Sequence, residues 1–182
     1  MAHVQISNDL PGIAGLLEMF PTTAAPLSLL AETLLRGPSS LSPAEREMIA
    51  TYVSAGNDCH FCARAHAAAA ARLPGAIPSL IDDLLAKRLS NKLDDRFAAL
   101  LTITEKVRRD ARSVTSADVQ RARAAGWDDG AIHDTVLIAA AFCMYNRYVD
   151  GLDTTQPREG AIYDAIGRKL ATEGYMRPIE AI

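Results

Sequence analysis

One stretch, LSPAEREMIATYVSAGNDCHFCARAH, limits the fold more than any other part of this chain. It opens with a strong helix start, because Ser42 and Glu45 have the spacing of a capping box. Gly56 is a typical C-terminal stop for this helix, and Asn57 or Asp58 can cap a second helix directly after it. The segment therefore predicts two helices joined by a tight turn, which favours an antiparallel hairpin.

The rest of the chain also reads as helical. Alanine is abundant and aromatic residues make up only 5 %, which favours helices over sheet, and no strand-like alternation or internal repeat is present. Prolines 21 and 26 are expected to break residues 10–36 into a short helix and a longer one. The expected helices are roughly 24–36, 57–73, 78–88, 94–110, a segment between Thr115 and Gly126, 128–149 and 160–173. The prediction is an all-α helical bundle with one domain over residues 1–182 and a redox core at about 42–150.

Charge and hydropathy argue against several functional classes. The net charge of −3 gives no electrostatic reason to expect nucleic acid as a partner. The longest apolar run, Thr135 to Tyr145, is too short to span a bilayer, and the N-terminus does not read as a signal peptide. We therefore expect no membrane partner and a cytoplasmic, reducing location, where a CxxC is more often reactive or metal-binding than a structural disulfide.

Two of the three cysteines and two of the four histidines lie within DCHFCARAH. Cys59 and Cys62 are three residues apart in the first turn of the expected second helix, so they share one face. Free backbone N–H groups and the helix dipole favour a thiolate at such a position. His66 lies one turn beyond Cys62 on the same face, whereas His60 points in another direction.

Glu47 joins this group through the geometry of the hairpin. It lies as many positions before the Gly56-Asn57 turn as His66 lies after it. On two antiparallel helices, the two side chains therefore stand at about the same height. A carboxylate opposite an imidazole, one turn from a thiol, is the arrangement of an orienting group, a base and a nucleophile.

These residue types suit thiol-dependent peroxide reduction. A thiolate attacks one peroxide oxygen and becomes a sulfenic acid. A second cysteine condenses with it to a disulfide and releases water, while the acid–base pair moves the protons. A dithiol donor must then reduce the disulfide.

The pattern of Glu, eleven residues, CxxC, three residues and His, filled by Glu47, Cys59, Cys62 and His66, resembles the alkylhydroperoxidase-D-like family with the carboxymuconolactone decarboxylase fold. Three further segments are similar to its peroxidase-related branch: LPGI at 10–13, LLRGPSSLSPAERE at 34–47 and AAAFCMYNRYVDGL at 139–152. The likeness covers nearly the whole chain.

The resemblance implies that Cys62 attacks the peroxide, that Cys59 resolves the intermediate, and that Glu47 and His66 form the proton relay. It also implies an all-α homo-oligomer, commonly a trimer or hexamer, that acts on a small peroxide without a cofactor. The reductant is then a dithiol, with a lipoyl-bearing adaptor as the donor in the studied members. The pattern departs at Phe61, where those members have a histidine.

Three other interpretations remain open. The cysteines can be inert core residues, or Cys59, Cys62 and His66 can bind zinc, with His60, Cys143 or Glu47 as the fourth ligand. The chain can also be a non-redox member of the same fold, such as a decarboxylase-like lyase or an interaction module. A thioredoxin domain is not expected because the βαβ alternation is absent.

Five residues outside the pattern have simpler readings. Cys143 is expected in the core, Trp127 at a helix junction, and His133 at the surface or an interface. Asn146 and Arg147 follow a buried-looking run, so they are expected to make structural or interface hydrogen bonds, with substrate binding as the alternative.

Overall fold

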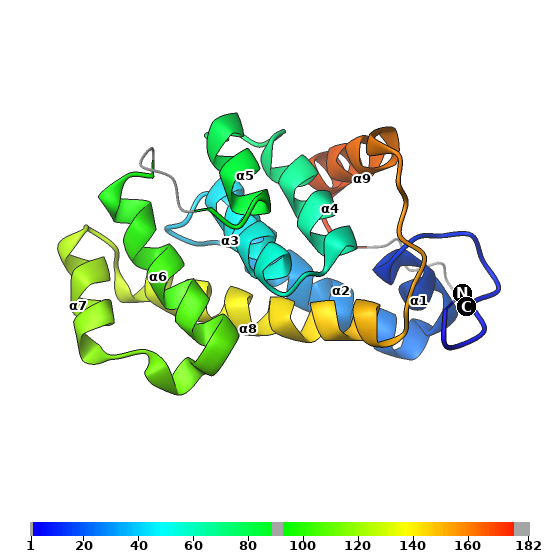
Figure 1. Cartoon of the computed structure of the whole chain (residues 1–182), viewed down its shortest axis with the longest axis horizontal. Helices are drawn as coiled ribbons and strands as arrows, with labels where there is room; N and C mark the ends of the chain where they lie inside the picture. The colour runs from blue at the N-terminus through cyan, green and yellow to red at the C-terminus, as the bar shows by residue number, and fades with distance from the viewer. Residues whose placement is uncertain (1, 89–92, 177–182) are drawn as a thin grey trace.

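The computed structural model describes residues 2–88 and 93–176 (Figure 1). This part of the chain holds nine α-helices, one short 3-10 helix and no strand, which confirms the all-α prediction. Residues 1, 89–92 and 177–182 of the expected domain lie outside the described residues. The helices are α1 (Ile13–Met19), α2 (Pro21–Arg36), α3 (Pro43–Gly56), α4 (His60–Ala70), α5 (Pro78–Leu85), α6 (Asp95–Asp110), α7 (Ser116–Ala124), α8 (Asp129–Gly151) and α9 (Gly160–Glu173), with the 3-10 turn η1 at Ala111–Ser113.

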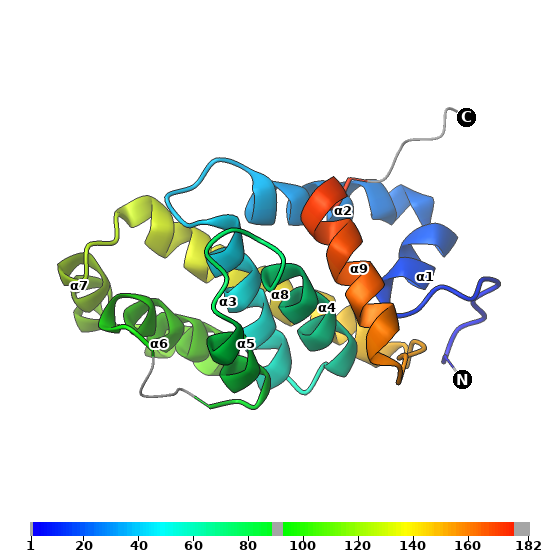
Figure 2. The same ribbon diagram turned by 90° about the horizontal axis from the view of Figure 1, so that it is seen from above.

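Helix α8 runs along the long axis of the molecule, and the hairpin of α3 and α4 packs beside it (Figure 1). Helices α6 and α7 lie at one end, while α1 and α9 lie at the other. Helix α9 packs on α4, and its C-terminal end approaches α2 (Figure 2). The central core is apolar, and its fully buried side chains include Leu35, Ile49, Val53, Leu84, Leu100, Leu101, Ile103, Ile138 and Phe142.

The hairpin forms for the expected local reasons. Ser42 Oγ accepts from the Glu45 amide, and the Glu45 carboxylate accepts from the Ser42 amide, so the capping box at the start of α3 is complete. A second capping box, formed by Thr115 and Asp118, starts α7. No helix of the described chain is both long and apolar enough to cross a membrane.

The start of α4 differs from the prediction. Asn57 is the C-cap of α3, and Asp58 has a positive φ of 62°, so neither residue caps α4. Cys59 is the N-cap residue instead, and α4 ends at Ala70 rather than near Leu73. The chain reverses through a left-handed residue, and this shifts the helix start by one or two positions.

The predicted helix break at Pro21 is confirmed, and the predicted break at Pro26 is wrong. Pro21 begins α2, which is the favoured place for proline in a helix, so the helix starts earlier than expected. Pro26 lies inside the same helix. Its position near the N-terminal end interrupts one intrahelical hydrogen bond, and the helix continues to Arg36.

A glycine sets the spacing between α4 and α9. A Cβ atom at Gly167 would lie 2.5 Å from the backbone carbon of Ala68, which is too close for any side chain. Gly160, at the first position of the same helix, faces open space. Helix α9 therefore rests on the backbone of α4 at the middle of its length.

We expect Gly167→Ala to destabilise the protein by about 1–3 kcal/mol, because the added methyl group forces α9 away from α4. This outweighs the roughly 1 kcal/mol that alanine gains over glycine inside a helix. Gly160→Ala is the matched control and should be neutral or slightly stabilising. Urea unfolding followed by circular dichroism measures both, and equal stability of the two variants would contradict this packing.

Candidate active site

Glu47 and His66 face each other across the α3–α4 hairpin. His66 Nδ1 lies 2.7 Å from Glu47 Oε2, which confirms the expectation that the two residues stand at the same height. A carboxylate accepts hydrogen bonds only, so Nδ1 is the donor. When the imidazole is neutral, its Nε2 atom is then left as a proton acceptor.

Two further groups reach the second oxygen of Glu47. Arg36 Nη2, at the end of α2, lies 2.6 Å from Glu47 Oε1. The hydroxyl of Tyr175, just beyond α9, donates to the same oxygen at 2.6 Å. Glu47 has an exposed fraction of 0 %, so no water hydrates its carboxylate. Hydrogen bonds from His66, Arg36 and Tyr175 replace that hydration.

The charges around Glu47 keep it ionised. Burial alone would raise the pKa of Glu47, but the hydrogen bond and charge of His66 and the charge of Arg36 outweigh it, so the pKa is lowered. Burial likewise opposes the charge of Arg36, and Glu47 more than offsets it, so the pKa of Arg36 is raised. Glu47 is therefore an anion at neutral pH, and it orients His66 rather than giving up protons itself.

Aromatic rings hold the imidazole in place. The Phe142 ring, on α8, meets the His66 ring edge-on, with centroids 4.6 Å apart. The Tyr175 ring lies nearly parallel to it, with centroids 6.0 Å apart. Together with the bond to Glu47, these contacts leave His66 little rotational freedom.

The two cysteines lie in a small apolar cluster at the start of α4. Cys59 is the N-cap residue and Cys62 the third helical residue, and both are free thiols. Their exposed fractions are 0 % and 3 %. The hydrogen bond with the Cys62 thiol, together with burial, raises the pKa of Cys59. The cluster is completed by Phe61, Ala65, Val149 and Tyr163.

A network of polar hydrogen bonds holds the turn that directly precedes the cysteines. Asn146, on α8, donates to Ser54 Oγ at 3.0 Å and accepts from Asn57 Nδ2 at 2.9 Å. Arg108, on α6, donates to the carbonyl of Gly56 at 2.9 Å. The structural expectation for Asn146 is thus confirmed, since its amide joins the turn to α8.

The position that departs from the family pattern has a packing role. Phe61 is buried, and its ring packs against Gly12. A Cβ atom added at Gly12 would lie 2.3 Å from the ring carbon Cδ1 of Phe61. Gly12 has a positive φ of 56°. His60 is exposed, beside the guanidinium of Arg64 at 3.5 Å, and does not join Glu47 and His66.

The remaining residues behave much as expected. Trp127 is buried and donates to the carbonyl of Arg96 at 2.7 Å, so it packs at the α7–α8 junction. Cys143 is partly buried against the core. Arg147 is exposed and donates to the carbonyl of Cys143, and His133 is exposed beside Asp134.

Comparison with known proteins shows which family the segment around these residues resembles. Residues 21–106 match the model of the carboxymuconolactone decarboxylase family. This segment contains Glu47, Cys59, Cys62 and His66. Slightly less than half of the chain therefore resembles the carboxymuconolactone decarboxylase family.

Several solved structures resemble a larger part of the chain. An uncharacterized peroxidase-related protein from Silicibacter sp. TM1040 is 29 % identical, with a TM-score of 0.74 over 85 % of this chain and 78 % of that one. The alkylhydroperoxidase AhpD core of an uncharacterized peroxidase-related protein from Ralstonia eutropha JMP134 is 26 % identical, with a TM-score of 0.77 over 87 % and 82 %. A protein of unknown function from Agrobacterium tumefaciens, 19 % identical with a TM-score of 0.70 over 87 % and 100 %, shares the fold. A search of curated proteins finds no match.

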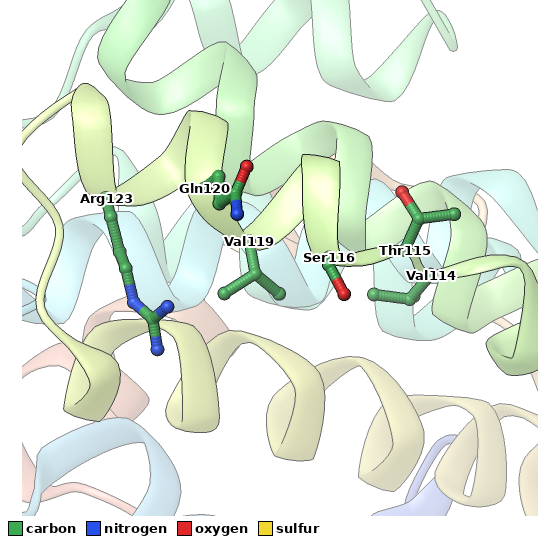
Figure 3. A pocket seen from close by; sticks show the side chains of 6 residues that line it. All are labelled: Val114, Thr115, Ser116, Val119, Gln120 and Arg123. Atoms are coloured by element: carbon green, nitrogen blue, oxygen red, sulfur yellow. The ribbon is translucent and has the colours of Figure 1, made fainter.

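The part of the chain that the structure describes holds no candidate metal site. Within residues 2–88 and 93–176, no three His, Cys, Asp or Glu side chains are grouped to hold one metal ion. The zinc interpretation therefore has no ligand set in that part of the chain. An open hollow along α7, lined by Val114, Thr115, Ser116, Val119, Gln120 and Arg123 (Figure 3), lies at the other end of the molecule from α9 and contains none of the candidate residues.

Sequence reasoning missed two members of the site, Arg36 and Tyr175. Arg36 lies eleven positions before Glu47 on a different helix, and Tyr175 follows it by 128 positions. No local spacing connects them to Glu47. The one available signal was Arg36 itself, a basic residue in the last turn of a helix, where it is more simply read as a favourable dipole interaction.

Glu47 should make the stability of the protein dependent on pH. The pKa of Glu47 is lower in the folded protein than in the unfolded chain, where the pKa of glutamate is about 4.3. The folded state therefore binds fewer protons, and the stabilisation is present at neutral pH and lost as the pH falls through the folded pKa. We expect Glu47→Gln to cost about 3 kcal/mol at pH 7 and progressively less below pH ~4.

Urea unfolding between pH 7 and pH 3 measures this difference. Glu45→Gln is the matched control on the same helix, because glutamine also serves in a capping box. A difference between wild type and Glu47→Gln that stays constant over this range would show that Glu47 is not held as an anion.

Proposed function

We propose that this protein is a thiol-dependent peroxidase of the alkyl hydroperoxide reductase type. The observation that carries the proposal is the buried Glu47–His66 pair at 2.7 Å, one helical turn beyond Cys62 in a reduced CxxC. The names of two related structures, both peroxidase-related proteins above 25 % identity, support it.

In the first step, His66 Nε2 accepts the proton of the Cys62 thiol. The thiolate attacks one oxygen of the peroxide, the O–O bond breaks, and Cys62 becomes a sulfenic acid. The leaving alkoxide or hydroxide takes the proton from His66 and departs as an alcohol or water. Glu47 remains ionised and stabilises the imidazolium that forms between these two proton transfers.

In the second step, the Cys59 sulfur attacks the sulfenic sulfur of Cys62. A disulfide forms, and the sulfenic hydroxyl leaves as water with the Cys59 proton. The raised pKa of Cys59 supports its assignment as the resolving residue, since it stays a thiol while Cys62 reacts. A dithiol donor, such as a lipoyl-type adaptor, then reduces the disulfide and is itself oxidised.

The protein is further proposed to act in the cytoplasm as a homo-oligomer, a trimer or hexamer, without a cofactor. Its substrate is a small peroxide. The apolar side chains around Cys59 and Cys62 support a peroxide with an organic substituent.

Counting thiols tests the redox chemistry. The reduced chain has three free cysteines, and one equivalent of peroxide should remove two of them. Cys143→Ser is the matched control and should still lose two. Cys59→Ser should give a trapped sulfenic acid at Cys62, and serine at this N-cap position preserves the helix start. A wild-type chain that loses no thiol at neutral pH would instead be a non-redox member of the family.

Rapid-mixing kinetics test the role of the ion pair. We expect Glu47→Gln to slow the oxidation of Cys62 by about 10²-fold at pH 7, because His66 loses the anion that stabilises its charged form. Glu45→Gln, on the same helix, should react at the wild-type rate. Circular dichroism shows whether each variant is folded, and a folded Glu47→Gln protein with the wild-type rate would contradict the relay.

A further inference from the structure

The segment after α9 brings a tyrosine hydroxyl into the Glu47–His66 pair. Tyr175 Oη donates to Glu47 Oε1 at 2.6 Å and lies 3.2 Å from His66 Nδ1. The guanidinium of Arg36 lies over the Tyr175 ring, 5.1 Å from its centroid. One side chain thus contacts the anion, the imidazole and the cation of the site.

The position of Tyr175 is held by several interactions. Its amide donates to Glu32 Oε2 at 2.6 Å, and Gly174 turns the chain with a positive φ of 73°. One turn along α2 from Glu32, Arg36 donates to the carbonyl of Leu170 at 2.9 Å. Helix α2 therefore fixes the end of α9, and this places the hydroxyl at Glu47.

We propose that Tyr175 is a positioning residue that sets the proton affinity of His66 by donating a hydrogen bond to Glu47. The inference rests on the proposed function, because it concerns the base that activates Cys62. A donor on Oε1 draws negative charge away from Oε2. Glu47 then attracts the imidazolium less strongly, and His66 holds its proton less tightly.

The hydroxyl is a constant donor over the working pH range. Burial and the charge of Glu47 raise the pKa of Tyr175 well above its usual value, so it stays protonated. The group therefore adjusts His66 without titrating itself. Glu47 on α3 and Tyr175 contact the imidazole, and α8 contributes the uncharged Phe142 ring. The charges of Arg36 on α2 and Arg46 on α3 interact with that of Glu47, and Glu32 on α2 interacts with Arg36 and with the Tyr175 amide.

Tyr175→Phe tests this role because it keeps the ring beside His66 and removes only the hydroxyl. Tyr145→Phe is the matched control. Tyr145 is also buried, packs on Phe142 and donates to a carbonyl, that of Leu27 at 2.7 Å, but it does not contact Glu47. Two readouts are needed: the NMR titration of the His66 imidazole and the pH profile of Cys62 oxidation by peroxide.

In Tyr175→Phe we expect the titration midpoint of His66 to rise by about half a pH unit or more. The acidic limb of the rate profile should move by the same amount, with a threefold or greater loss of rate below the midpoint. Tyr145→Phe should leave both unchanged. Should Tyr175→Phe fail to fold, Glu32→Ala and Glu32→Gln provide a second comparison. Both remove the same charge, but only Glu32→Gln keeps an oxygen acceptor for the Tyr175 amide, so the titration midpoint of His66 should be higher in Glu32→Ala.

The two hypotheses fail in different ways. An unchanged His66 titration in folded Tyr175→Phe, with an active wild-type enzyme, overturns the role of Tyr175 alone. A wild-type protein whose thiols do not react with peroxide overturns the proposed function, whatever the NMR titration shows.

Discussion

The contact between Glu47 and His66 is the interaction on which the rest of the site depends. A carboxylate with no exposure to water is stable as an anion only when nearby donors replace its hydration. Here the replacements come from separate elements: His66 on α4, Arg36 at the end of α2, and Tyr175 beyond α9. One side chain thus brings together segments that are far apart in the sequence, at the central hairpin. Removing any of these donors leaves a buried charge less well solvated, so the site and the packing of α2 and α9 are energetically linked.

Small residues make this convergence possible. Helix α4 is rich in alanine, and Gly167 allows α9 to lie directly on its backbone at Ala68. A close approach there lets the chain turn at Gly174 and return Tyr175 to α3. The abundance of alanine, which at first indicates only helix propensity, therefore also sets the distance between the helices that form the site.

The sequence predicts the hairpin better than it predicts the site. The capping box of Ser42 and Glu45 and the equal height of Glu47 and His66 follow from local rules and helix geometry, and both agree with the structure. Arg36 and Tyr175 could not be found this way, because tertiary packing alone brings them to Glu47. The error at the start of α4 has a different cause. Asn57 and Asp58 are both good capping residues, but the tight reversal uses Asp58 in a left-handed conformation and leaves the cap to Cys59.

This correction changes how the two cysteines compare. The CxxC spacing alone suggests two equivalent thiols in a first helical turn. In the structure Cys59 stands at the N-cap position, while Cys62 is the third residue inside α4, one turn from His66. Cys59 is fully buried and hydrogen-bonded to the other thiol, which raises its pKa. The structure thus distinguishes the two thiols by their positions in the helix and by the raised pKa of Cys59.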